Sequence, residues 1–69
     1  MIQTILYTMP NCGICNMMKI KLHEKNIPFQ EKPLIDYYEQ LQIERAPVLQ
    51  IGDQILSSPI EINTWINKQ

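Results

Sequence analysis

The sequence contains no apolar run that approaches the eighteen or more residues of a membrane-spanning helix. It also lacks an excess of basic residues, because 6 Lys and Arg are offset by 7 Asp and Glu, for a net charge of −1. A protein that neutralises many phosphates needs such an excess, so nucleic acid is not expected as a main partner. The first basic residue is Lys19, so the N-terminal region lacks the charged start of a signal peptide. We therefore expect a soluble cytoplasmic protein without a membrane partner.

Internal repeats, low-complexity tracts and linkers are also absent. With 69 residues, 45% of them hydrophobic, the chain suits one small globular domain and not a disordered segment. We treat residues 1–69 as a single domain and expect a monomer.

The sequence has only two cysteines, Cys12 and Cys15. A disulfide between them would close a loop of four residues, which restricts the unfolded chain much less than a longer loop does. A purely structural disulfide is therefore a poor explanation for the pair. Two small hydrophobic residues that happen to lie three apart remain an alternative.

The first half of the chain predicts a strand, a helix and a second strand. Residues 4–8 are β-branched and aromatic without clean alternation, which is typical of a central strand covered on both faces. Apolar residues at helical spacing from position 12 onward predict a helix that ends near Asn26, before Pro28. Residues 27–31 are predicted as an extended edge strand, because a proline fits the start of a strand or a sheet edge.

The second half predicts a short helix followed by a hairpin. Apolar contacts within residues 34–41 favour a short helix. Residues 47–51 and 54–57 are apolar runs joined by Gly52-Asp53, a pair typical of tight antiparallel hairpins.

A final helix is indicated directly after the hairpin. Ser58 is predicted as its N-cap and Pro59 as its first residue, with the Glu61 side chain reaching back to the Ser58 amide. Its predicted buried face consists of Ile62, Trp65 and Ile66. A right-handed strand–helix–strand crossover followed by a hairpin predicts an α/β fold, a four-stranded mixed sheet with helices on both faces.

The sequence Cys12-Gly13-Ile14-Cys15 falls at the predicted junction of the first strand and helix. Unpaired amides at a helix start present roughly half a positive charge, which stabilises a thiolate. We expect this field to lower the pKa of Cys12 from about 8.5 into a range of about 3.5 to 7.5. Cys15, one turn deeper, would attack a mixed disulfide formed at Cys12. Gly13 permits the close approach of another backbone.

These residues resemble the thioredoxin-fold dithiol oxidoreductases, and within them the glutaredoxins and the NrdH redoxins linked to ribonucleotide reductase. The resemblance covers nearly the whole chain and implies a thioredoxin-like, glutaredoxin-type fold. It rests on Tyr7-Thr8-x-Pro10-x-Cys12-x-x-Cys15, Lys19, Ala46-Pro47-Val48 and Gly52-Asp53.

The resemblance also implies a substrate site. Pro47 would follow a cis peptide bond and lie against the two sulfurs, where the Ala46 backbone would pair with an incoming peptide or thiol. From the residues alone, Pro47 could equally be an ordinary turn proline, and Tyr7 is better explained as a packed aromatic than as a proton donor. With catalytic Cys12 and Cys15, the implied substrate-binding residues are Tyr7, Met9, Gly13, Ile14, Ala46, Pro47, Ser57 and Ser58.

Two features depart from the glutaredoxin pattern. Met9 replaces a usual Lys, and Ser57-Ser58 followed by Glu61 replaces a Gly-Gly pair and Asp. The aromatic, Arg-containing segment of NrdH redoxins is replaced by Leu56-Ser57-Ser58-Pro59. Both glutathione and thioredoxin reductase therefore stay open as electron donors, with no bound cofactor expected. The amides that open the last helix could receive a carboxylate of glutathione or of a partner.

We thus expect an enzyme that reduces protein disulfides or glutathione mixed disulfides, with ribonucleotide reductase as a candidate target. One alternative is a soft-metal carrier or an iron–sulfur module that uses the same cysteines. Met9-x-x-Cys12-x-x-Cys15 resembles the Met-x-Cys-x-x-Cys loop of copper chaperones, although the spacing is one residue too long. The other alternative is a redox-inactive binding module. His23 and Arg45 are interpreted as exposed surface residues.

Overall fold

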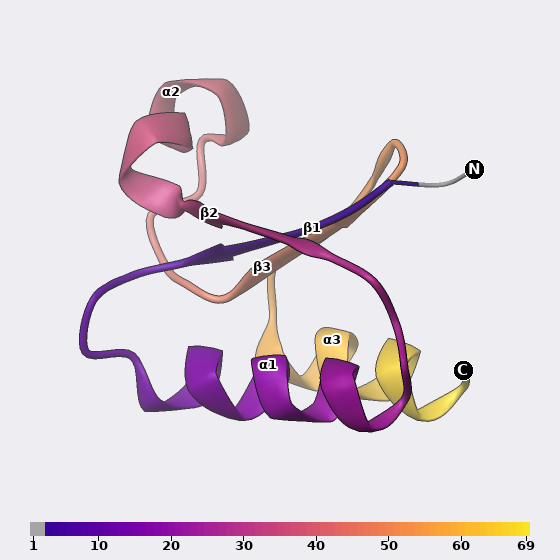
Figure 1. Ribbon diagram of the computed structural model, residues 1–69. Helices are drawn as coiled ribbons and strands as arrows, with labels where there is room; N and C mark the ends of the chain where they lie inside the picture. The colour runs from indigo at the N-terminus through magenta and orange to yellow at the C-terminus, as the bar shows by residue number, and fades with distance from the viewer. Residues whose placement is uncertain (1–2) are drawn as a thin grey trace.

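A computed structural model describes residues 3–69 of the chain. The order of strands and helices agrees with the prediction, except that the predicted short helix consists of a 3-10 helix, η1, and one turn of α-helix, α2 (Figure 1). The elements are β1 (Thr4–Thr8), α1 (Gly13–Glu24), β2 (Gln30–Pro33), η1 (Leu34–Tyr37), α2 (Tyr38–Leu41), β3 (Val48–Ile51), β4 (Gln54–Leu56) and α3 (Pro59–Asn67).

The four strands form one mixed sheet in the order β2-β1-β3-β4. β1 runs parallel to β2 and antiparallel to β3, and β4 pairs antiparallel with β3. The sheet thus has β1 inside and β2 at an edge, which confirms both predictions and the predicted hairpin.

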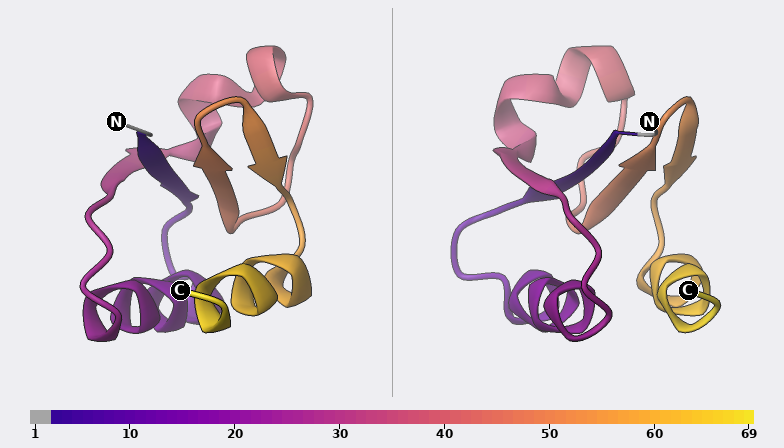
Figure 2. Two further views of the ribbon diagram at one scale, coloured as in Figure 1. Left: turned by 90° about the vertical axis from the view of Figure 1, so that its right-hand side faces the viewer. Right: turned by 45° about the vertical axis from the view of Figure 1, so that its right-hand side comes forward.

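Helices cover both faces of the sheet, as expected. α1 and α3 lie side by side on one face, whereas η1 and α2 lie on the other (Figure 2). Two apolar clusters separate these layers. The cluster under α1 and α3 consists of Leu6, Met18, Leu22, Leu49, Leu56, Ile62 and Ile66. The cluster under η1 and α2 consists of Ile5, Tyr7, Leu34 and Val48.

The edge strand begins later than the sequence suggested. Asn26 adopts a left-handed conformation with φ 57°, and the Ile27 amide donates to the Leu22 carbonyl oxygen, so the chain reverses there. Ile27 and Phe29 then pack against the cluster under α1 and α3. Residues 27–29 are therefore used to cross from the helix to the sheet, and β2 starts only at Gln30.

The last helix begins at Pro59 with Ser58 as its N-cap, as predicted. The Ile60 N–H donates to the Ser58 hydroxyl oxygen at 3.2 Å. Glu61 does not complete the predicted capping box: it is exposed, and residues 3–69 contain no hydrogen bond between its carboxylate and the Ser58 amide. Its neighbours in an apolar surface groove are Trp65 and Lys68, so the side chain faces that groove.

Across residues 3–69, every helix is too short or too polar to cross a membrane.

Candidate active site

The two cysteines lie at the junction of β1 and α1. Cys12 is the N-cap of α1, and its sulfur accepts a hydrogen bond from the Cys15 N–H at 3.1 Å. The two residues are joined by a disulfide, with their Cα atoms 5.2 Å apart. Asn11, directly before Cys12, has a left-handed φ of 59°. The turn that precedes the helix therefore aims the Cys12 sulfur at the first helical amides.

The two sulfurs differ in their access to solvent. Cys12 is half-buried, whereas Cys15 is 1% exposed and faces the interior with Met18 and Leu22 of the same helix. A partner that approaches from solvent therefore meets Cys12 first. Cys15 is within bonding distance of Cys12 but has almost no surface of its own.

An open, apolar surface adjoins Cys12 on the first turns of α1. Gly13 is the first helical residue, and a Cβ atom added there would meet no atom within 4 Å. The exposed side chains of Ile14 and Met17 follow, at 44% and 46%. This part of the site leaves room for the main chain of a partner beside Cys12.

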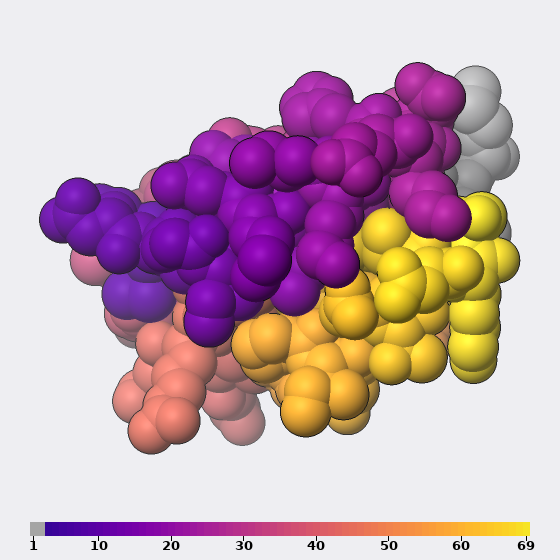
Figure 3. All heavy atoms as spheres, turned by 90° about the horizontal axis from the view of Figure 1, so that it is seen from below, coloured from indigo at the N-terminus to yellow at the C-terminus, as the bar shows by residue number. Residues whose placement is uncertain are grey.

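The loop before β3 lies at the same end of the sheet as the cysteines. The Ala46–Pro47 bond is cis, as the family resemblance implied, and Pro47 is fully buried. Val48 pairs with Tyr7 near the end of β1, so the loop adjoins the strand that leads to Cys12. Figures 1 and 3 show this loop and the start of α1 at one end of the molecule.

Tyr7 lies on the sheet face opposite α1. It is 3% exposed, its hydroxyl donates to Gln50 Oε1 at 2.9 Å, and its ring meets Tyr37 edge-on at 5.0 Å. The structure therefore gives Tyr7 a packing role and leaves it almost no surface for a substrate. We do not include it in the proposed site.

Met9 is half-buried in the loop that leads to Cys12. Its sulfur accepts a 3.9 Å contact from the Tyr38 hydroxyl, and the side chain packs against the cluster under η1 and α2. It also lines a surface cavity of about 380 Å³ that extends to Lys32 and Pro33 of β2.

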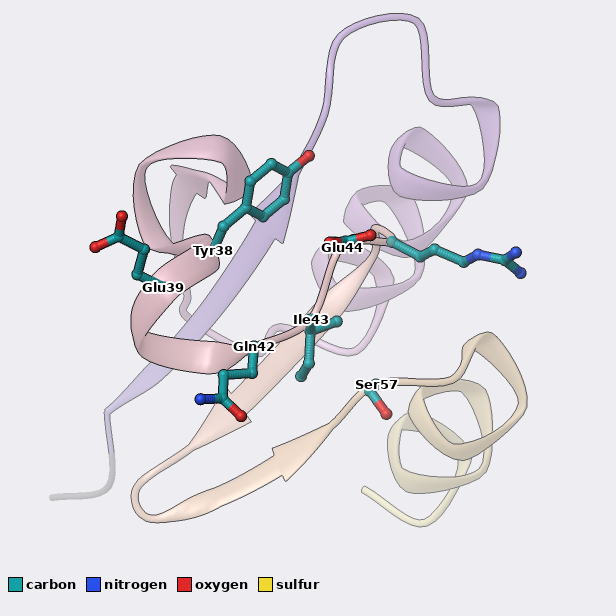
Figure 4. Close-up of a pocket in the computed structure, with 7 residues that line it drawn as sticks. Tyr38, Glu39, Gln42, Ile43, Glu44 and Ser57 are labelled. Atoms are coloured by element: carbon teal, nitrogen blue, oxygen red, sulfur yellow. The ribbon is translucent and has the colours of Figure 1, made fainter.

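A larger cavity of about 700 Å³ opens beside the loop that holds Ala46 and Pro47. It is lined by six residues between Tyr38 and Arg45, and by Ser57 (Figure 4). In Figure 4, Ser57 lies across the opening from Ile43. Ser58, the next residue, is the N-cap of α3, and its hydroxyl oxygen is already engaged by the Ile60 amide.

Sequence reasoning pointed to Ser57 and Arg45 but missed the contribution of α2 to this cavity. Residues 38–45 directly precede Ala46-Pro47, and this position in the sequence could have indicated that they lie beside the loop.

A carboxylate on β2 joins the strand before Cys12 to the helix that carries Cys15. Glu31 Oε2 accepts from the Thr8 hydroxyl at 2.9 Å and from the Lys19 ammonium at 3.2 Å. These two hydrogen bonds, that of Thr8 first, hold the pKa of Glu31 below its ordinary value. Thr8 and Lys19 belong to the motif that carries the family resemblance, but their contacts with Glu31 were not predicted.

His23 and Arg45 are exposed, as expected. The His23 ring meets Phe29 edge-on at 5.4 Å near the far end of α1. Within residues 3–69, no three His, Cys, Asp or Glu side chains are grouped so that they could hold a metal ion.

A sequence-family model described as Glutaredoxin matches residues 4–56, more than half of the chain. The chain belongs to the glutaredoxin family. No curated protein matches the sequence significantly.

Solved structures show the same fold for this glutaredoxin-family domain at low identity. A glutathione transferase homologue from Drosophila mojavensis with bound glutathione superimposes with a TM-score of 0.82 at 18% identity, over 99% of this chain. The domain spans only 35% of that protein's length. NrdH-redoxin from Escherichia coli superimposes with a TM-score of 0.69 at 21% identity, over 90% of this chain and 92% of that one. A thioredoxin-like protein gives 0.77 at 18% identity, over 93% and 99%.

These matches establish a thioredoxin-like fold for the glutaredoxin-family domain. The copper chaperones considered above finish in a strand, whereas here the hairpin is followed by helix α3. Family membership together with the Cys12–Cys15 disulfide supports a thiol–disulfide oxidoreductase.

Proposed function

We propose that the protein is a dithiol carrier that reduces disulfides of proteins or of glutathione. The Cys12 thiolate attacks one sulfur of the partner disulfide, forms a mixed disulfide and releases the first partner thiolate. The Cys15 thiolate then attacks the Cys12 sulfur, releases the second partner thiolate and leaves the Cys12–Cys15 disulfide. Two electrons pass to the partner, and an external thiol donor restores the dithiol.

The observation that carries this proposal is the placement of the bonded pair at the start of α1. Cys12 is the accessible sulfur and already accepts the Cys15 N–H, while Cys15 is buried within bonding distance. In the reduced protein the same amide and the helix dipole stabilise a Cys12 thiolate, which is the nucleophilic form. The division of roles between an attacking Cys12 and a resolving Cys15 follows from this difference in access.

The surroundings of Cys12 favour docking of a polypeptide substrate. Gly13 and Ile14 offer an open surface on one side, and the cavity between α2 and Ser57 lies near Ala46 and Pro47 on the other. We include Met9 in the site because it lies in the loop that leads to Cys12 and lines the surface cavity that extends to β2. Pro59 has no amide hydrogen and the Ile60 amide is bonded to the Ser58 hydroxyl oxygen, so a substrate carboxylate would be received by the remaining hydrogen of the Ser58 hydroxyl.

The electron donor and the physiological target are part of the proposal. Glutathione and thioredoxin reductase are both retained as donors, and ribonucleotide reductase as a target. A cytoplasmic location and a monomeric state stay predictions. Re-reduction of the oxidised protein by glutathione alone, measured against re-reduction by thioredoxin reductase with NADPH, identifies the donor by the faster rate.

The role assignment is tested by trapping. Cys15→Ser is expected to accumulate a mixed disulfide with a model disulfide substrate through Cys12, seen as a mass increase that a reductant removes. Cys12→Ser is expected to abolish reduction and to trap nothing, because Cys15 is 1% exposed. Ile20→Ser on the same helix, 57% exposed and outside the proposed site, is the matched control and is expected to keep turnover. Equal trapping by both cysteine variants would contradict the assignment.

A further inference from the structure

Glu31 occupies a position that neither the cysteine chemistry nor the family match accounts for. It lies on the edge strand β2, opposite Leu6 in the parallel register, and its side chain reaches Thr8 at the end of β1. The same oxygen, Oε2, also accepts from the Lys19 ammonium of α1. One carboxylate on β2 thus connects β1 and α1, the two elements that the active-site segment joins.

The two donors flank the cysteine pair along the chain. Thr8 is the last residue of β1, and residues 9–11 lead from it to Cys12. Lys19 follows Cys15 by one helical turn. The Glu31 contacts therefore restrain the distance between the strand that delivers Cys12 and the helix that carries Cys15, without touching either sulfur.

The need for this restraint differs between the two redox forms. In the oxidised form the disulfide itself fixes Cys12 to the first turn of α1. In the reduced form that bond is absent, so a turn with the left-handed Asn11 of the oxidised form would depend on non-covalent contacts alone. A contact adds less stability when the segment it restrains is already held by a covalent bond, because less conformational freedom is left to lose.

We propose that Glu31 is a positioning residue for the dithiol, which stabilises the reduced active-site loop by holding Thr8 and Lys19 together. This inference rests on the proposed dithiol function. The side chains of Lys19 and Glu31 are 31% and 43% exposed, and an exposed pair of this kind contributes little to folding. Its effect is therefore expected to be smaller on the stability of the oxidised fold than on that of the reduced fold, and this difference appears in the redox equilibrium.

The test is the equilibrium of the full chain with a reference dithiol: protein disulfide plus reference dithiol gives protein dithiol plus reference disulfide. Glu31→Ala is expected to lower the equilibrium constant about threefold, which is about 14 mV at 29.6 mV per tenfold change for a two-electron couple. Thr8→Val, which removes one donor without changing the charge, is expected to shift it in the same direction. Glu31→Gln keeps an acceptor oxygen and is expected to shift it less than Glu31→Ala.

Glu24→Gln is the matched control, since it removes a carboxylate from α1 without affecting Thr8 or Lys19. It is expected to leave the equilibrium constant unchanged. The thermal midpoints of both redox forms are measured for every variant. If Glu31→Ala lowers both midpoints equally and leaves the equilibrium constant at the wild-type value, Glu31 is an ordinary surface contact and the inference is wrong. If the wild-type protein reaches no equilibrium with the reference dithiol, the proposed function itself fails.

Discussion

The two faces of the sheet are covered in different ways. On one face, α1 and α3 are helices of 12 and 9 residues, packed over seven buried side chains. On the other face, η1 and α2 have four residues each, lie over four buried side chains, and α2 itself buries none. The second face also relies on polar contacts, such as those of Tyr7 with Gln50 and Tyr38 with Met9.

The two layers hold different parts of the candidate site. Cys15 belongs to the face with the longer helices, where its neighbours are fully buried. Met9 and Ala46, which belong to the proposed substrate site, pack against the cluster of the thinner face. The buried sulfur thus lies in the layer with the longer helices, while the proposed substrate surface lies against the layer with the shorter ones.

The largest expected effect is on the free energy of unfolding, when the same Leu→Ala substitution is made in each of the two apolar clusters. Leu22 and Leu34 are both 0% exposed, one on each face. Leu22→Ala is expected to cost about 3–4 kcal/mol in the free energy of unfolding, because two long helices close poorly over the cavity, and Leu34→Ala about 2 kcal/mol, because η1 can move inward. Denaturant unfolding of the oxidised variants measures both. A larger cost for Leu34→Ala would reverse the comparison.

A smaller effect is expected for hydroxyl groups on the thinner face. Tyr7→Phe removes a 2.9 Å hydrogen bond to a half-buried amide oxygen and is expected to cost about 1 kcal/mol. Tyr38→Phe is the matched control: it removes only a 3.9 Å contact to the weak acceptor sulfur of Met9 and is expected to cost under about 0.5 kcal/mol. Equal costs in denaturant unfolding would show that the Tyr7–Gln50 bond adds nothing.

The smallest effect concerns the pH dependence of protein stability that Glu31 causes. Its carboxylate contacts Lys19 of α1, on the face with the longer helices. Its pKa in the folded protein is below the ordinary value of 4.5, because the Thr8 and Lys19 hydrogen bonds favour the carboxylate. Its contribution is therefore fully present above about pH 4.5 and is lost as the pH falls through the lower folded-state pKa. Glu31→Gln is expected to flatten the acid limb of the stability curve of the oxidised protein. Parallel curves for wild type and variant from about pH 5 to 3 would contradict this.

Most of the fold could be predicted because local signals agreed with it. The apolar residues 4–8 indicated a central strand, and Gly52-Asp53 with Ser58-Pro59 indicated the hairpin and the start of α3. The start of β2 was missed because the left-handed Asn26 and the docking of Phe29 depend on tertiary packing. Local propensity does not show where a chain leaves a helix to reach a sheet.

From the residues alone, the candidate site was predicted only where its residues are close in sequence. The motif Cys12-Gly13-Ile14-Cys15 and the loop at Pro47 were both found, the second through family resemblance. The contacts of Glu31 with Thr8 and Lys19 bring together three elements, so no sequence spacing revealed them. Tyr7 was placed among the substrate residues only through the family resemblance; from the residues alone it was a packed aromatic, which is how the structure holds its ring.

The strand order has a consequence for how the molecule behaves at high concentration. An unpaired outer strand can recruit the same strand of another molecule and start an aggregate. Here one outer strand, β2, carries Glu31, Lys32 and Pro33, and the other, β4, has only three residues. Charge, a missing amide hydrogen and short length each discourage such recruitment, so both borders of the sheet are protected against intermolecular strand pairing.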